Sequence, residues 1–130
     1  MSLRCVLIVE PDIIIRHGLA EYLRECGYRV LEALDAAEAR QLLANKFAPI
    51  DVVLADVDAP GENGFALAAW MRRACPDVAI ILAGSLTTAA ARAGDLCEEG
   101  PTLGKPYDHR IVHDHIKRLL ATRDRGMNAD

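Results

Sequence analysis

The stretch from Asp51 to Gly64 constrains the fold more than any other part of this 130-residue chain. It begins with apolar and β-branched residues, a pattern typical of a buried strand in a parallel sheet. The run ends at two acids, Asp56 and Asp58, and a Pro-Gly turn follows. A strand that ends in this way places a carboxylate at the sheet edge where open α/β folds bind ligands. The alternative is that Asp56 only caps a turn, because Asp is a common turn residue.

The rest of the chain alternates between short apolar runs and segments of helical periodicity. Strands are predicted at residues 3–9, 28–33, 51–56, 78–82 and 101–104, and helices at 14–26, 35–47, 64–74, 88–98 and 111–120. This order predicts an α/β fold, a doubly wound five-stranded parallel sheet with helices on both faces. We expect one domain over residues 1–122 and a frayed tail over 123–130, where no period continues.

Charge and hydropathy exclude several classes of partner. The net charge is −4 and no run is rich in Lys or Arg, so we expect no direct binding to nucleic acid. No apolar stretch is long enough to cross a membrane, and no signal segment precedes the first strand. The four cysteines are widely spaced and predict reduced packing residues. Together these features predict a cytoplasmic protein without membrane contact.

Polar side chains gather where the predicted strands end. They are Glu10, Asp12, Asp56, Asp58, Ser85 and Lys105. Neighbouring carboxylates repel one another unless a cation lies between them. Mg²⁺ is the natural candidate, because it prefers oxygen ligands and needs only one or two carboxylates besides water and phosphate. Lys105, held by the following proline, places an ammonium at the same edge, so the set suits phosphoryl chemistry.

Three pieces of sequence carry a resemblance to a known family. They are residues 6–10 (VLIVE), the pattern D-x-x-x-P-G-x-x-G from Asp56 to Gly64, and residues 104–107 (GKPY). The sequence resembles the receiver domains of response regulators in two-component signalling, over residues 3–120. The resemblance implies the flavodoxin-like (βα)5 receiver fold. It also implies phosphorelay signal transduction, in which a histidine kinase or a histidine phosphotransfer protein donates a phosphoryl group.

The resemblance assigns roles residue by residue. Asp56 matches the phosphoacceptor, which becomes a phosphoaspartate and also contributes to the metal site. Lys105 matches the lysine that pairs with the phosphoacceptor and then with the phosphoryl group. Glu10 matches an acid that reaches Mg²⁺ through water, and Asp58 lies where a backbone carbonyl binds the metal. Asp12 is interpreted as a helix cap, with a place in the metal site as the alternative.

Three positions depart from the family pattern. Pro11 replaces the second acid, Ala83 replaces a Ser or Thr that contacts the phosphoryl group, and Thr102 replaces an aromatic residue. The loss of one acid predicts weak Mg²⁺ binding. We hypothesise that the side chain of Asp58 partly restores the lost charge, the alternative being that it faces solvent.

Several functional alternatives stay open. The first interpretation is a receiver that is phosphorylated on Asp56 and regulates a downstream protein that the sequence does not name, with self-association through residues 88–98, 101–104 and 111–120. A pseudo-receiver that binds its partner without phosphorylation is the runner-up, in which Asp56 and Lys105 form only a structural ion pair. The chain could also be the receiver fragment of a transcription regulator or kinase. We do not expect an enzyme, since no Gly-rich phosphate loop or nucleophile–base pair is present.

Overall fold

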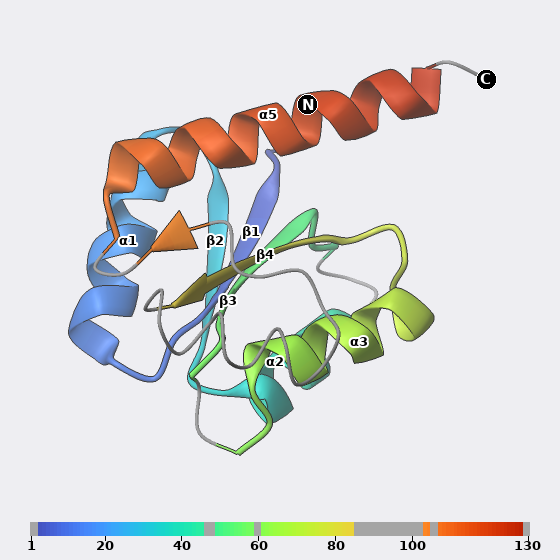
Figure 1. Cartoon of the computed structure of the whole chain (residues 1–130). Helices are drawn as coiled ribbons and strands as arrows, with labels where there is room; N and C mark the ends of the chain where they lie inside the picture. The colour runs from blue at the N-terminus through green and yellow to red at the C-terminus, as the bar shows by residue number, and fades with distance from the viewer. Residues whose placement is uncertain (1–2, 46–48, 59–60, 85–102, 105–106, 129–130) are drawn as a thin grey trace.

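The computed structural model describes residues 3–45, 49–58, 61–84, 103–104 and 107–128 (Figure 1). Its elements are β1 (Cys5–Val9), α1 (Ile13–Glu25), β2 (Arg29–Ala33), α2 (Ala36–Ala44), β3 (Val52–Asp56), α3 (Gly64–Ala74), β4 (Ala79–Gly84), β5 (Leu103–Gly104) and α5 (His109–Asn128). The strands are parallel in the order β2-β1-β3-β4-β5. The predicted doubly wound α/β fold is confirmed. The helix predicted at 88–98 lies outside the described residues.

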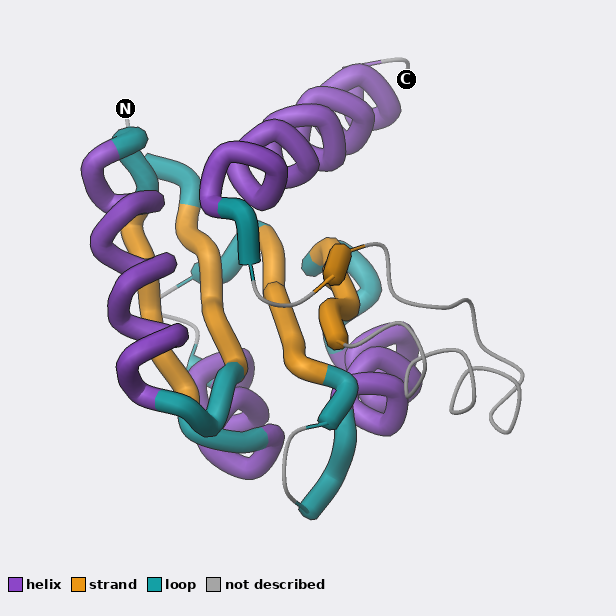
Figure 2. The backbone as a smooth tube through the Cα atoms, turned by 60° about the vertical axis from the view of Figure 1, so that its left-hand side comes forward, coloured by secondary structure: helices purple, strands orange, loops and turns teal. Residues whose placement is uncertain are grey.

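Of the described helices, α1 and α5 lie on one face of the sheet and α2 and α3 on the other (Figure 1 and Figure 2). Side chains of β1 alternate between the two layers. Val6 and Ile8 pack with α1 and α5, and Leu7 and Val9 pack with α2 and α3. Because both faces are covered, the whole of β1 is buried, which explains why its sequence is continuously apolar. No helix within the described ranges is long and apolar enough to cross a membrane.

Each described helix begins after an Asp or Asn whose side chain accepts backbone N–H groups of the first turn. These residues are Asp12 for α1, Asp35 for α2, Asn63 for α3 and Asp108 for α5. Such a cap contributes about 1 kcal/mol, because it satisfies donors that have no partner inside the helix. Gly27, at φ 102°, follows the end of α1 in the left-handed conformation that favours glycine.

The C-terminal helix is longer than its sequence pattern predicts. It continues through Asn128, whereas the apolar period predicted a helix that ends at residue 120. Nη2 of Arg4 donates to both carboxylate oxygens of Asp124 at 2.6 Å, and Nη1 of Arg123 donates to the carbonyl oxygen of Asp51 at 2.7 Å. These partners lie just before β1 and β3. Apolar periodicity does not indicate such polar contacts, so it predicted an end of the helix earlier than the structure shows.

Candidate functional site

Glu10 and Asp56 lie side by side at the carboxyl ends of two neighbouring strands. The register of β1 and β3 pairs Val9 with Ala55, which makes the next residue of each strand an acid. Glu10 is 1% exposed and Asp56 is 2% exposed, and they are the buried charged residues among those that the structure describes. Burying two adjacent carboxylates is unfavourable unless charge and hydrogen bonds compensate them. The pair is therefore the candidate site.

Each of these carboxylates accepts a hydrogen bond from the backbone N–H two residues further along. Asp12 N donates to Oε2 of Glu10 at 3.2 Å, and Asp58 N donates to Oδ1 of Asp56 at 2.9 Å. Both bonds close a short turn, so each acid is held against the loop that follows its own strand. The orientation of the pair therefore depends on the shape of the β1–α1 and β3–α3 connections.

Glycines shape the connection that follows Asp56. A Cβ on Gly64 would lie 2.9 Å from the carbonyl oxygen of Asp56, and a Cβ on Gly84 would lie 2.4 Å from Cγ2 of Val57. Gly61 has φ 75°, which a residue with a side chain rarely adopts. A side chain at Gly64 would therefore crowd the backbone at the end of β3, one at Gly84 would crowd Val57, and one at Gly61 would strain the backbone.

Arg40 links the β3–α3 connection to helices α2 and α3. Arg40 on α2 forms an ion pair with Glu62, and its guanidinium carbon lies 4.9 Å from the centre of the Trp70 ring on α3. Cation–π contacts of this kind stabilise a partly exposed arginine in one orientation. The loop that carries Glu62 is thus anchored to both α2 and α3.

Ala83 and Asp58 lie next to Asp56 on its β4 side. The register of β3 and β4 pairs Asp56 with Ala83, whose methyl group is buried in the core that faces α1 and α5. Asp58 is exposed, and its Oδ2 is 3.5 Å from the place of a Cβ on Gly84. Pro11 lies on the opposite side of Asp56, after β1. The Asp58 carboxylate therefore lies toward β4, and Pro11 lies toward β1.

The predicted partners Lys105, Thr102 and Ser85 lie outside the described residues. Their expected roles therefore remain predictions.

Tyr107 also lies near the two acids. In the sequence it stood out only as the last residue of the motif at 104–107. Burial, together with the negative charges of Glu10 and Asp56, raises the pKa of the Tyr107 phenol. Its ring is partly buried against the core formed with α1 and α5. The available signal was its position directly after Lys105 and Pro106, beyond the last strand.

The donor chemistry of the pair fits Mg²⁺. Glu10 and Asp56 supply carboxylate oxygens, which this hard cation prefers, and Mg²⁺ binds through one or two carboxylates with water completing the shell. Among the described residues, no group of three or more His, Cys, Asp or Glu side chains is placed to hold a metal. A site in which two carboxylates supply the protein ligands is consistent with both observations.

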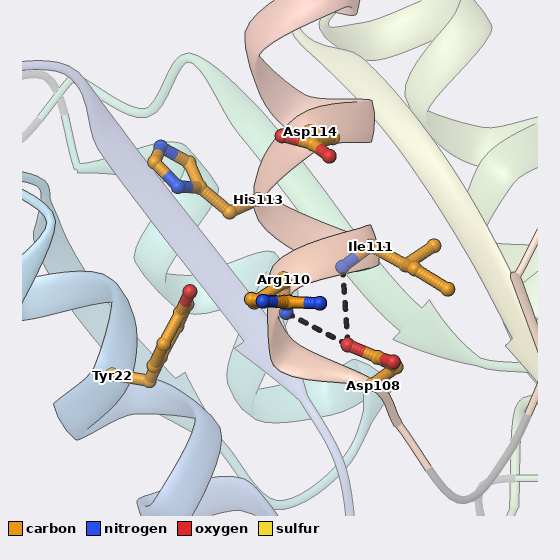
Figure 3. A pocket seen from close by; sticks show the side chains of 6 residues that line it. All are labelled: Tyr22, Asp108, Arg110, Ile111, His113 and Asp114. Carbon is orange, nitrogen blue, oxygen red and sulfur yellow. Dashed lines mark hydrogen bonds between the residues drawn. The ribbon is translucent and has the colours of Figure 1, made fainter.

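A separate cavity of about 440 Å³ lies at the seam between α1 and α5 (Figure 3). It is lined by Tyr22, Asp108, Arg110, Ile111, His113 and Asp114. Aromatic contacts close this seam: the Tyr22 and His109 rings are 5.2 Å apart, and those of Tyr28 and His113 are 5.3 Å apart. None of the predicted site residues lines the cavity, so it is distinct from the acidic pair.

The strand order and the acids at adjacent strand ends define a flavodoxin-like α/β domain with its site at the carboxyl edge of the sheet. The chain belongs to the response regulator receiver domain family, whose model matches residues 6–117. The family predicted from the sequence motifs is thus confirmed.

Individual relatives agree with this assignment. The chain is 34% identical to the transcriptional regulatory protein GltR of Pseudomonas aeruginosa over 121 residues, which cover 90% of this chain and 49% of GltR. It is 35% identical to the aerobic respiration control protein ArcA of Escherichia coli over 116 residues, 89% of this chain and 48% of ArcA. The chain therefore spans about half the length of these relatives.

A solved structure shows the same fold. The CheY-like receiver domain protein of Methanospirillum hungatei superimposes with a TM-score of 0.79 at 25% identity. The match covers 96% of this chain and 99% of that protein.

Proposed function

We propose that this chain is a receiver in a two-component phosphorelay and accepts a phosphoryl group on Asp56 from a histidine kinase or a histidine phosphotransfer protein. The observation that carries the proposal is the buried Asp56 beside Glu10 at the carboxyl edge of the sheet. Membership of the receiver family supports it. Relatives named as regulators and as a sensor kinase, CckA of Brucella abortus, are consistent with signalling.

In the proposed reaction an oxygen of the Asp56 carboxylate attacks the phosphorus of a phosphohistidine. The O–P bond forms and the N–P bond breaks; the electron pair of the broken bond stays on the donor nitrogen, which takes up a proton from water, so the histidine leaves as neutral imidazole. The N–H of Asp58 donates to Oδ1 of Asp56 and so helps to orient the carboxylate. Glu10 and Asp56 would hold Mg²⁺, which lowers the repulsion between carboxylates and phosphoryl oxygens. Lys105 is proposed to pair with the phosphoryl group.

A pseudo-receiver is the second candidate, and two described positions favour it. Pro11 contributes no carboxylate to the metal site, and Ala83 presents a buried methyl group beside Asp56 where the family has a hydroxyl. Such a protein would bind its partner through its surface without a phosphoryl switch. In both versions we propose a cytoplasmic signalling module and not an enzyme.

Neither candidate function identifies the downstream protein that this chain would regulate. Because the chain spans about half of GltR and ArcA, a receiver fragment of a longer regulator is a further proposal. Self-association through the surface predicted at residues 88–98, 101–104 and 111–120 also remains a proposal.

Phosphorylation can be tested with acetyl phosphate and Mg²⁺, followed by mass spectrometry of the intact protein. We expect one added phosphoryl group, lost in Asp56→Asn and kept in Asp77→Asn, which changes an exposed turn acid after α3. Labelling of Asp56→Asn would show that the acceptor is wrong. An unlabelled wild-type protein would favour the pseudo-receiver.

A further inference from the structure

Arg16 on α1 connects the loop that carries Glu10 to the neighbouring strand. Its Nη1 donates to the carbonyl oxygen of Glu10 at 2.7 Å, and its Nε donates to Oε1 of Glu32 on β2 at 3.1 Å. The Arg16 side chain is 12% exposed and that of Glu32 is 21% exposed. A largely buried guanidinium with two partners is held in one geometry, since its planar fork loses little freedom for each hydrogen bond.

Pro11, the residue after Glu10, makes the contact between Arg16 and Glu10 more important for the loop. Pro11 has no N–H, so it cannot donate a backbone hydrogen bond to hold the turn after β1. Glu10 is instead held from both sides, because its N–H donates to the carbonyl oxygen of Ala33 at 3.1 Å and its carbonyl accepts from Arg16. The Glu10 carboxylate then accepts the N–H of Asp12.

Glu32 keeps Arg16 in place by remaining charged. Burial alone raises the pKa of the Glu32 carboxyl, but hydrogen bonds from His17 and Arg16 and the charge of Arg24 lower it overall. Glu32 is therefore an ionised acceptor in the folded protein, and charge-assisted hydrogen bonds are the stronger class.

We propose that Arg16 is a positioning residue of the acidic site: anchored by Glu32, it holds the Glu10 carbonyl and so fixes the turn that orients the Glu10 carboxylate beside Asp56. This inference rests on the proposed function insofar as the acid pair binds Mg²⁺. Residues that orient metal ligands commonly change metal affinity tenfold or more when removed. Arg16 has this effect through Glu10, without contacting the metal.

Arg24 provides a matched control on the same helix. Its Nη2 also donates to Glu32, at 3.4 Å, and to a backbone carbonyl of β2, that of Val30, at 2.9 Å. Arg24 additionally pairs with Glu21 at 2.8 Å. Arg16→Gln and Arg24→Gln therefore both remove an ion pair with Glu32 and a bond to a carbonyl, but only the first releases Glu10.

The test compares the two variants in the full chain, first without metal and then during Mg²⁺ titration followed by NMR. In the metal-free protein we expect Arg16→Gln to shift the Asp12 amide and the Glu10 carboxyl resonances, and Arg24→Gln to leave them in place. We expect Mg²⁺ to bind about tenfold more weakly to Arg16→Gln and within about twofold of wild type to Arg24→Gln. Arg16→Lys keeps the charge but not the fork, so it should restore binding in part.

The outcomes separate this inference from the proposed function. Equal weakening in both glutamine variants would assign the effect to general loss of stability and overturn the inference, as would unchanged Glu10 and Asp12 signals in Arg16→Gln. If wild type binds no Mg²⁺, the proposed metal site fails. The metal-free spectra then decide the inference alone, since shifts at Glu10 and Asp12 in Arg16→Gln that are absent from Arg24→Gln support it. If Arg16→Gln does not fold, Arg16→Lys is compared with Arg24→Gln in its place.

Discussion

Gly64→Ala should destabilise the protein because it crowds the end of the strand that carries Asp56. The new Cβ would lie 2.9 Å from the carbonyl oxygen of Asp56, 3.1 Å from its carbonyl carbon and 3.1 Å from Cα of Val57. All three are backbone atoms, so no side chain can rotate away. Either α3 or the end of β3 must move.

Gly18→Ala is the matched control. Gly18 is also a helical glycine, but no heavy atom lies within 4 Å of the place its Cβ would take. Alanine there should stabilise α1 by about 0.5–1 kcal/mol, the usual difference from glycine inside a helix. Crowding of a packed site typically costs about 1–3 kcal/mol, so the two variants should differ by about 1.5–4 kcal/mol.

Urea unfolding measures this difference directly. We expect a lower midpoint than wild type for Gly64→Ala, a higher one for Gly18→Ala, and equal slopes if both stay two-state. NMR should show amide shifts at Asp56 and Val57 for Gly64→Ala alone. If Gly64→Ala is as stable as Gly18→Ala, the close approach of α3 to β3 does not limit this position, and the account of the glycine pattern is wrong.

Three further predictions concern the switch, the metal and pH. Because Ala83 and Thr102 lack the family's hydroxyl and aromatic ring, beryllofluoride should shift NMR signals near Asp56 and leave α5 unchanged; large shifts in α5 would reveal another coupling route. Asp58→Ala should change Mg²⁺ affinity less than about twofold, since its exposed carboxylate lies toward β4 and its backbone carbonyl is retained; a larger loss in a Mg²⁺ titration would support charge compensation. Glu32→Gln should cost about 1 kcal/mol at neutral pH. Because the pKa of Glu32 is lowered in the folded protein, this stabilisation is present at pH values above the ordinary pKa of a glutamate and should be lost as the pH falls through the lowered pKa; a cost that persists unchanged in strong acid in urea unfolding would contradict the assignment.

Much of the fold could be predicted because its signals are local. A strand covered on both faces must be apolar throughout, and this is why residues 3–9 and 51–56 could be predicted as buried strands. Helix starts could be located in the same way, since Asp12 and Asp35 act on backbone groups within their own first turn. The family motifs are also short stretches of chain, so their identification did not depend on the packing.

The site could be predicted only in part. The sequence placed Glu10 directly after one strand and Asp56 at the end of another, and the register of β1 and β3 brings the two acids together. Two further features depend on how loops and helices pack. The Asp58 side chain points toward β4, and Tyr107 lies close enough to Glu10 and Asp56 for their charges to raise the pKa of its phenol. No spacing rule covers such contacts.

Tertiary structure alone decided what holds these parts in place. The sequence by itself determined the order of elements, the faces that become core, and the acids delivered to the carboxyl edge. Arg4 with Asp124, and Arg16 with Glu32, join residues far apart in the chain, so their pairing requires that the sheet register already exist. The periodicity of the sequence does not indicate which polar side chains will pair, because their partners are fixed by geometry after the backbone has packed. The length of α5 and the support of Glu10 therefore emerge only in the folded chain.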